Sequence, residues 1–328
     1  MCAFHNSVHT RFLMKTDLFK IEKQPKRGLF AAEWIMFGYM AFTLLIVFFT
    51  YTKVTNPEAM IWGRIRIAVI TLAMWAVYRM VPCRLTRFAR IVVQMSLLSW
   101  WYPDTYELNR ALPNLDHVFA AAEQSLFGCQ PALHFSTALP WPVVSELMDM
   151  GYAAYYPMIV LAAVYYFVWR YAEFQRATFV VMASFFAYYV IFDLVPVTGP
   201  TFYYNAVGLD NIAAGIFPNV GDWFNTHTEC LPSPGYTDGL FYHLVEDAKA
   251  AGERPTAAFP SSHVGISTVI MFLVWHTKNR RLFFIMIPFY VFLCLATVYI
   301  QAHYAIDALS GLISGTVFYF LFMYVYRE

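Results

Sequence analysis

The stretch Ala258-Phe259-Pro260-Ser261-Ser262-His263-Val264-Gly265 leads directly into a long apolar segment at residues 262–277. A second polar motif, His303-Tyr304-Ala305-Ile306-Asp307, opens another apolar segment at residues 304–326. Each motif therefore marks the mouth of a predicted membrane helix. We expect the fold to be organised around these two helix mouths.

The residue types in the two motifs suit the chemistry of phosphorus. Two serines followed by a histidine at a helix start offer hydroxyls, free backbone N–H groups and an imidazole to one anion. His303 and Asp307 lie four residues apart, so they share a helix face and the carboxylate can orient the imidazole. One histidine would attack phosphorus while the other protonates the leaving oxygen. The pattern predicts a phosphoryl-transfer site that needs no metal and no other cofactor.

The composition is that of a membrane protein. The 328 residues are 59% hydrophobic and only 13% charged, about half the charged share of a soluble domain. About 20 apolar residues span a bilayer. The sequence therefore predicts an all-α, polytopic bundle with lipids and no nucleic acid as partners, and leaves the oligomeric state open. About eight spans are predicted, at residues 29–52, 61–82, 87–102, 151–171, 177–197, 262–277, 282–301 and 304–326.

These segments divide the chain into three parts. Residues 1–28 are predicted to be a basic cytosolic tail that is disordered or lies at the membrane interface, and residues 29–86 two N-terminal transmembrane helices. Residues 87–328 are predicted to form the catalytic transmembrane core, with two long extracytoplasmic loops at 103–150 and 198–260.

The distribution of charge predicts the orientation. With the N-terminus inside, 16 of the 22 Lys and Arg residues fall on the cytosolic side, as the positive-inside rule requires. Both termini are then cytosolic, and His263 and His303 share the extracytoplasmic face. That face is the periplasm in a bacterium and the Golgi lumen in a eukaryote.

The two outer loops carry further signals. In the first, apolar residues recur at helical spacing before Gly128, which predicts an amphipathic helix on the surface. This helix either packs against the bundle or guides lipid to the site. The second loop is expected to lie over the helix mouths as a lid, with Tyr203 and Tyr204 as interface anchors. The apolar residues of the first loop are Leu115, Val118, Phe119, Ala122, Leu126 and Phe127.

Five cysteines are scattered without a Cys-x-x-Cys pair, so the sequence contains neither a zinc ribbon nor a thioredoxin-like motif. Cys129 and Cys230 both fall in the predicted outer loops. Whether they form a disulfide is open at this stage.

A phosphate needs cationic neutralisation. Arg254 is the nearest arginine to the Ser-His motif in sequence, and Lys249 is the next candidate. A second His-x-x-x-Asp pair, His243 and Asp247, falls in an outer loop, where we expect an ordinary solvated helix face.

Three alternatives stay open. The His303–Asp307 pair can be a structural clamp, and Ser261 and Ser262 can be helix caps alone. His263, His303 and Asp307 are also legitimate zinc ligands, although no cysteine or third histidine lies at ligand spacing.

The motifs resemble those of the type 2 phosphatidic acid phosphatase/haloperoxidase superfamily. Pro260-Ser261-Ser262-His263 is similar to its Pro-Ser-Gly-His motif, and His303 and Asp307 match its His-x3-Asp motif. The resemblance implies a six-helix core with His303 as the nucleophile, oriented by Asp307. His263 would be the general acid, and Ser261, with its neighbour Ser262, would bind the phosphate.

Two departures point to one branch of that superfamily. Ala296-Thr297 stands in the Ser-Arg positions, and Lys249-x4-Arg254-Pro255 has the wrong spacing for Lys-x6-Arg-Pro. The sequence looks closer to the inositol phosphorylceramide synthases. Their second motif resembles Ala258 to Gly265. Their third motif includes a tyrosine like Tyr304, which we expect to bind substrate. The third motif of that branch is matched by Thr297, Tyr299, His303, Tyr304 and Asp307.

The resemblance implies a transferase that moves a phosphorylated headgroup, such as phosphoinositol, from a phospholipid to the hydroxyl of a lipid such as ceramide. A lipid phosphate phosphatase, in which water replaces the acceptor, would use the same residues. A lipid transporter is the non-enzyme alternative. Its usual signal of broken, paired helices with charges at mid-membrane is missing from this sequence.

Overall fold

The computed structural model describes residues 18–326, and its regular secondary structure is helical throughout. The extended contacts in this range are limited to one isolated β-bridge between Ile21 and Cys83. The all-α, polytopic class is therefore confirmed.

Five helices are long and apolar enough to cross a membrane. They are α2 (Ala31–Phe49), α3 (Pro57–Met80), α10 (Phe174–Leu194, preceded by the 3-10 turn Tyr171–Glu173), α15 (Arg280–Tyr299) and α16 (Ala305–Val325). A sixth span is formed if α8 (Pro142–Ala153) and α9 (Tyr155–Trp169), which are bent by 46°, count as one.

The remaining two expected spans are not single long helices. The third divides at Leu97 into α4 (Arg84–Ser96) and α5 (Leu98–Asn109), and the sixth is the 15-residue helix α14 (Ser262–His276). Fifteen residues rise about 22 Å, less than the ~30 Å of a hydrocarbon core. By its length alone, α14 is therefore not a full membrane span.

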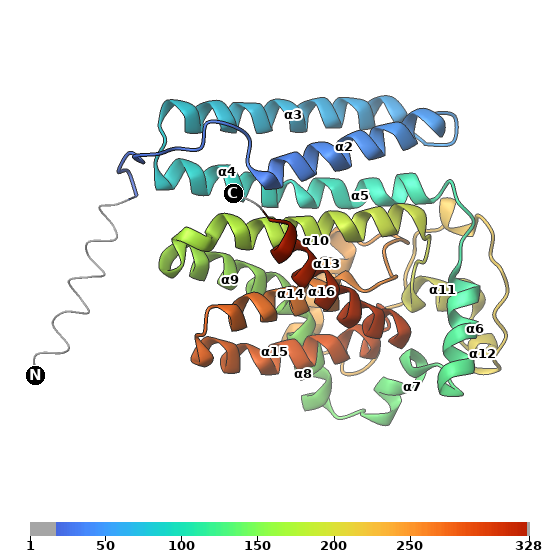
Figure 1. The fold of residues 1–328 in the computed structure, drawn as a ribbon. Coiled ribbons are helices and arrows are strands. Elements are labelled where there is room, and N and C mark those ends of the chain that lie inside the picture. The colour runs from blue at the N-terminus through green and yellow to red at the C-terminus, as the bar shows by residue number, and fades with distance from the viewer. Residues whose placement is uncertain (1–17, 327–328) are drawn as a thin grey trace, which may run out of the picture.

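The long helices run side by side (Figure 1). Residues 18–28 and the turns that join α3 to α4, α9 to α10 and α14 to α15 gather at one end of the bundle. The opposite end carries the short helices of the two outer loops: α6 (Asp116–Phe127), α7 (Pro131–Ala138), α11 (Pro200–Val207), α12 (Leu209–Ala213) and α13 (Leu240–Gly252).

The described part of the predicted N-terminal tail is packed against the bundle, contrary to the expectation of disorder for that part. Glu22 N–H donates to the Pro82 carbonyl at 2.7 Å, and the Glu22 carboxylate accepts from the hydroxyls of Tyr78 at 2.7 Å and Tyr171 at 2.9 Å. Residues 1–17, the rest of that tail, lie outside the described residues.

The second outer loop folds into a small core that it shares with the first outer loop and the starts of the neighbouring helices. Tyr203 and Tyr204 are fully buried in it, and they donate to the Pro218 carbonyl at 2.8 Å and to Gln130 Oε1 at 3.1 Å. The interpretation of these tyrosines as interface anchors was therefore wrong. Cys129 and Cys230 are both free thiols.

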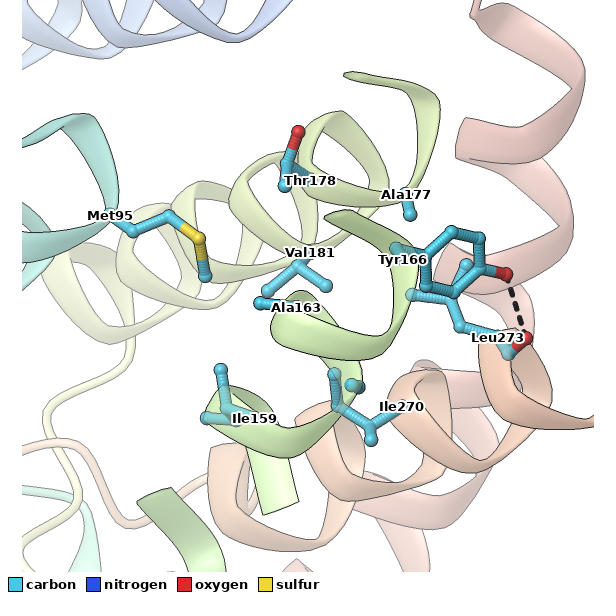
Figure 2. A pocket seen from close by; sticks show the side chains of 10 residues that line it. Met95, Ile159, Ala163, Tyr166, Ala177, Thr178, Val181, Ile270 and Leu273 are labelled. Atoms are coloured by element: carbon cyan, nitrogen blue, oxygen red, sulfur yellow. Dashed lines mark hydrogen bonds between the residues drawn. The ribbon is translucent and has the colours of Figure 1, made fainter. Parts of the chain in front are cut away.

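An apolar cleft lies between α4, α9, α10 and α14 (Figure 2). Its two hydroxyl groups are already used, because Tyr166 donates to the Leu273 carbonyl at 2.8 Å and Thr178 to the Phe174 carbonyl at 2.9 Å. The cleft offers no free polar group for chemistry. Its lining residues are Met95, Ile159, Ala162, Ala163, Tyr166, Ala177, Thr178, Val181, Ile270 and Leu273.

Glycines let α14 and α16 approach closely beside the two motifs. A Cβ atom on Gly311 would lie 2.5 Å from the Ser261 carbonyl oxygen, and one on Gly315 would lie 2.3 Å from the Gly265 carbonyl oxygen. Small residues commonly permit such close approach of membrane helices. The two helices that carry the candidate site are thereby held in register.

We expect Gly311→Ala to destabilise the protein by about 1–3 kcal/mol, the usual effect of overpacking a tight interface. Gly38→Ala, in α2, is the matched control because nothing lies within 4 Å of its added Cβ. Thermal unfolding in detergent measures both. Equal melting temperatures for the two variants would contradict the close packing.

Candidate active site

His303 is held by the loop that precedes α14. Its Nδ1 lies 2.8 Å from the Ala258 carbonyl oxygen, and its side chain is almost fully buried. A carbonyl can only accept, so Nδ1 carries the proton and the neutral ring has its lone pair on Nε2. Burial lowers the pKa of His303 to about 4, although the Ala258 hydrogen bond and the Glu253 carboxylate oppose the shift. At neutral pH the ring is therefore unprotonated at Nε2, as a nucleophile requires.

Asp307 lies beside His303, but its hydrogen bond goes elsewhere. The shortest approach of its Oδ2 to His303 Nδ1 is 3.8 Å, whereas Oδ2 accepts from the Tyr304 N–H at 2.9 Å. Its Oδ1 is buried without a hydrogen-bond partner. The group that orients the imidazole directly is thus the Ala258 carbonyl, and Asp307 caps the start of α16.

We therefore expect Asp307→Asn to lower activity by about 10- to 100-fold, or about 1.4–2.7 kcal/mol, because Asp307 Oδ2 accepts from the Tyr304 N–H and so positions the turn that carries His303. The measurement is kcat/KM with a phospholipid substrate. A loss near 10⁴-fold, as when a triad histidine loses its carboxylate, would instead mean that Asp307 takes over the Nδ1 proton during turnover.

His263 stands next to His303. The ring centroids are 5.8 Å apart, although the two residues are 40 positions apart in sequence. His263 stacks against Tyr152, with centroids 4.8 Å apart, and contacts Tyr155 at 4.4 Å. Its Nδ1 is buried without a hydrogen-bond partner. The two imidazoles are close enough to act on one phosphorus centre.

The two serines have different environments. Ser261 is the N-cap of α14: its Oγ accepts from the Val264 N–H at 3.4 Å, and its own N–H donates to the Asp307 carbonyl at 3.0 Å. The Ser261 hydroxyl is buried and committed to this cap. The next two N–H groups, of Ser262 and His263, are in the first helical turn, where intrahelical acceptors are lacking. These N–H groups and the Ser262 hydroxyl are the groups that this helix start offers to an anion.

The neighbouring helix start, that of α16, is already occupied by an acidic side chain. Glu123 Oε1 accepts from the Ala305 N–H at 2.5 Å, and the Glu123 side chain is fully buried. Burial raises the pKa of Glu123 to about 8, with the Asp307 carboxylate contributing in the same direction. Of the two helix N-termini at the site, that of α14 is therefore the one open to a phosphate.

The two predicted cations do not reach the histidines in the described contacts. Lys249 Nζ donates at 3.1 Å each to the Leu231 carbonyl, Ser233 Oγ and Glu246 Oε1, so its three protons serve the outer loop. Arg254 is exposed, and its charge acts on Tyr106. The charged neighbour that acts on His303 is Glu253, whose own pKa is raised by burial.

Tyr304 supports the site through Asp116, a residue that sequence reasoning missed. Its hydroxyl donates to Asp116 Oδ1 at 3.1 Å, and Asp116 also accepts from the backbone N–H groups of Thr198 at 2.8 Å and Gly199 at 2.9 Å. Tyr304 is thus committed to the protein interior, where the sequence had predicted a substrate contact. One sequence feature could have indicated this buried contact. Asp116 and Glu123 are two acids seven residues apart, so they lie on one face of a mostly apolar helix.

The second His-x-x-x-Asp pair behaves as expected, because His243 and Asp247 both lie on the exposed face of α13. Within residues 18–326, no three His, Cys, Asp or Glu side chains converge as they would in a metal site.

Searches of curated proteins and of solved structures returned no match. A family model described as PAP2 superfamily matches residues 116–321, from the start of α6 to near the end of α16. The match covers more than half of the chain and includes both histidines, while α2 and α3 lie outside it. The chain therefore belongs to the PAP2 superfamily, whose members are usually phosphatases or phosphotransferases.

Proposed function

We propose that this protein is a lipid phosphotransferase that moves a phosphorylated headgroup from a phospholipid to the hydroxyl of a second lipid through a phosphohistidine. The observation that carries the proposal is the state of His303. Its Nδ1 proton is fixed on the Ala258 carbonyl, and its ring stands 5.8 Å from that of His263.

The proposed reaction has two balanced steps. His303 Nε2 attacks phosphorus, the bond to the glycerol oxygen breaks, and His263 gives that oxygen a proton, so diacylglycerol leaves. The acceptor hydroxyl then gives its proton to His263 and attacks phosphorus. The P–N bond breaks and the lone pair returns to His303.

The charge of the site favours a phosphodiester donor. A phosphodiester carries one negative charge, whereas a phosphomonoester carries about 1.5 to 2 at neutral pH. The positive group available for that charge is the N-terminus of α14, worth about half a positive charge, because His303 is neutral and the nearby Glu253 is an acid. Phosphatidylinositol is a donor of the required kind, and phosphatidate is not.

Two features support transfer over hydrolysis. Ala296 and Thr297 stand where a Ser-Arg pair is typical of hydrolases; both are fully buried, and the Thr297 hydroxyl donates to the Cys294 carbonyl at 2.9 Å. The folded outer loop also packs around the two helix mouths, because Ala258 and Tyr304 belong to its core. Such a cover helps to exclude water while a lipid acceptor, such as ceramide, enters from the bilayer.

The test uses a fluorescent ceramide-like acceptor in detergent with phosphatidylinositol or phosphatidate as donor. A new fluorescent phospholipid, formed from phosphatidylinositol together with an equal amount of diacylglycerol, is the expected result. His303→Ala protein gives the background. Headgroup phosphate released at the same rate with and without acceptor would identify the enzyme as a phosphatase.

We also propose that the site faces the extracytoplasmic side, because the basic segments gather at the opposite end of the bundle. A membrane-impermeant thiol reagent added from outside should label a cysteine introduced at Leu240 and miss one introduced at Asn279. The reverse labelling pattern would invert the orientation.

A further inference from the structure

Helix α6 presents three different faces. Asp116, Ala120 and Glu123 form the inward face, and all three are fully buried. At about 100° per residue, His117 and Gln124 lie along one flank of the helix. The opposite flank is apolar, with Leu115, Ala122 and Leu126, and Val118 next to it on the outward side. Leu126 is 65% exposed and Val118 50% exposed.

The inward face connects α6 to both catalytic motifs. Asp116 accepts from the Tyr304 hydroxyl, and Glu123 accepts from the Ala305 N–H at the start of α16. Phe119 packs against Phe259, in the loop that leads to His263, with ring centroids 4.7 Å apart. The position of α6 is therefore tied to the positions of both histidine-bearing segments.

The orientation of α6 fits a membrane boundary. Figure 1 shows α6 running across the ends of the long helices, not along them. The helix that α6 contacts, α16, exposes the apolar side chains of Leu309 and Ile313 in its first turns, so α6 lies beside a helix with an exposed apolar surface. One apolar flank and one polar flank are what a helix at the lipid–water boundary requires.

We propose that α6 is an interfacial helix whose apolar flank, with Val118, inserts into the leaflet on the active-site side. The partner is the lipid surface itself. Through their contacts with Tyr304 and Ala305, the buried acids Asp116 and Glu123 connect this anchoring to the site, and so place the site near the phospholipid headgroups. The inference holds whether the bound phosphoryl group passes to a lipid or to water.

Two adjacent alanines offer a matched test. Ala121 and Ala122 are both exposed, but Ala122 lies toward Leu126 and Ala121 toward the polar flank. p-Benzoylphenylalanine is introduced at either position of the full chain in phosphatidylcholine nanodiscs and irradiated. Lipid adducts from position 122 and not from position 121, measured by mass spectrometry, are the expected result. Equal yields, no adduct at either position, or a crosslinked second copy of the chain would overturn the proposal.

Activity provides a second readout. Ala122→Glu and Leu126→Glu should lower turnover in vesicles by about tenfold or more, because a charge replaces buried apolar contact with lipid. Turnover of a short-chain substrate in detergent should stay unchanged, and Ala121→Glu should match the wild type in both. Equal losses in detergent and vesicles would show that α6 has only an internal structural role. Since crosslinking needs no turnover, failure of the proposed reaction would leave the lipid adducts intact.

Discussion

Replacing His303 by alanine should lower activity by about 10⁴-fold or more, because removal of a covalent nucleophile eliminates the reaction path. The side chain is almost fully buried, and its Nδ1 is held by the Ala258 carbonyl, so the proposed attacking atom is a fixed Nε2 that alanine does not replace. The matched control is His243→Ala. That residue belongs to the same His-x-x-x-Asp pattern but lies exposed on α13, and its loss should be near neutral.

The covalent intermediate gives the sharper measurement. Wild-type protein mixed with a phospholipid labelled with ³²P in its headgroup, then denatured in alkali, should retain label with the acid lability of a phosphohistidine. His303→Ala should retain none at the same expression level. Label retained by His303→Ala, or activity lost equally in His243→Ala, would mean that another residue is the nucleophile.

His263→Ala should lower turnover by about 10²- to 10⁴-fold, the usual contribution of a general acid and base. The loss should depend on the leaving group, since His263 is proposed to protonate the departing glycerol oxygen. With a phosphodiester whose leaving group is 4-nitrophenol, which departs without a proton, phosphoenzyme formation should largely recover in His263→Ala. It should not recover in His303→Ala.

The contrast between the two variants is what makes the assignment testable. The His263 ring lies between Tyr152 and Tyr155, so its loss also removes packing. A structural defect would lower the reaction rate equally for substrates with a glycerol and with a 4-nitrophenol leaving group. If His263→Ala loses activity equally with both leaving groups, His263 is not the general acid and contributes only packing.

The sequence alone predicts the fold class and the kind of chemistry at the site. Apolar segments of 16 to 24 residues predict membrane helices because an unpaired backbone is costly in lipid, and the all-α class follows from them. A serine and a histidine at the start of one such helix, and a His-x-x-x-Asp pair at the start of another, predict a phosphoryl site at two helix mouths. The measured proximity of His263 and His303 agrees with that prediction.

Local pattern was less informative about helix lengths. The segment at 87–102 reads as one apolar run, yet the chain divides at Leu97 and the second part continues to Asn109. The segment at 262–277 was expected to be a membrane span, and α14 follows its predicted bounds, but 15 residues are too few to count as a full span by length. Hydropathy reports where a chain prefers lipid, but packing against neighbouring helices sets where each helix breaks and how deep it begins.

The sequence did not predict which residues form hydrogen bonds across long sequence separations. The partner of His303 is a backbone carbonyl, which every residue possesses, so no residue type marks Ala258 for this role. The sequence predicted Lys249 as a phosphate ligand, but in the structure its ammonium group donates to three acceptors of the outer loop. Asp116 and Glu123 read as polar residues of a surface helix, yet they are buried against Tyr304 and Ala305. Composition and spacing thus predict helices and the kind of chemistry, because these follow from residue type. Which donor meets which acceptor depends on how distant segments pack, because each buried polar group takes whatever partner the fold brings within about 3 Å.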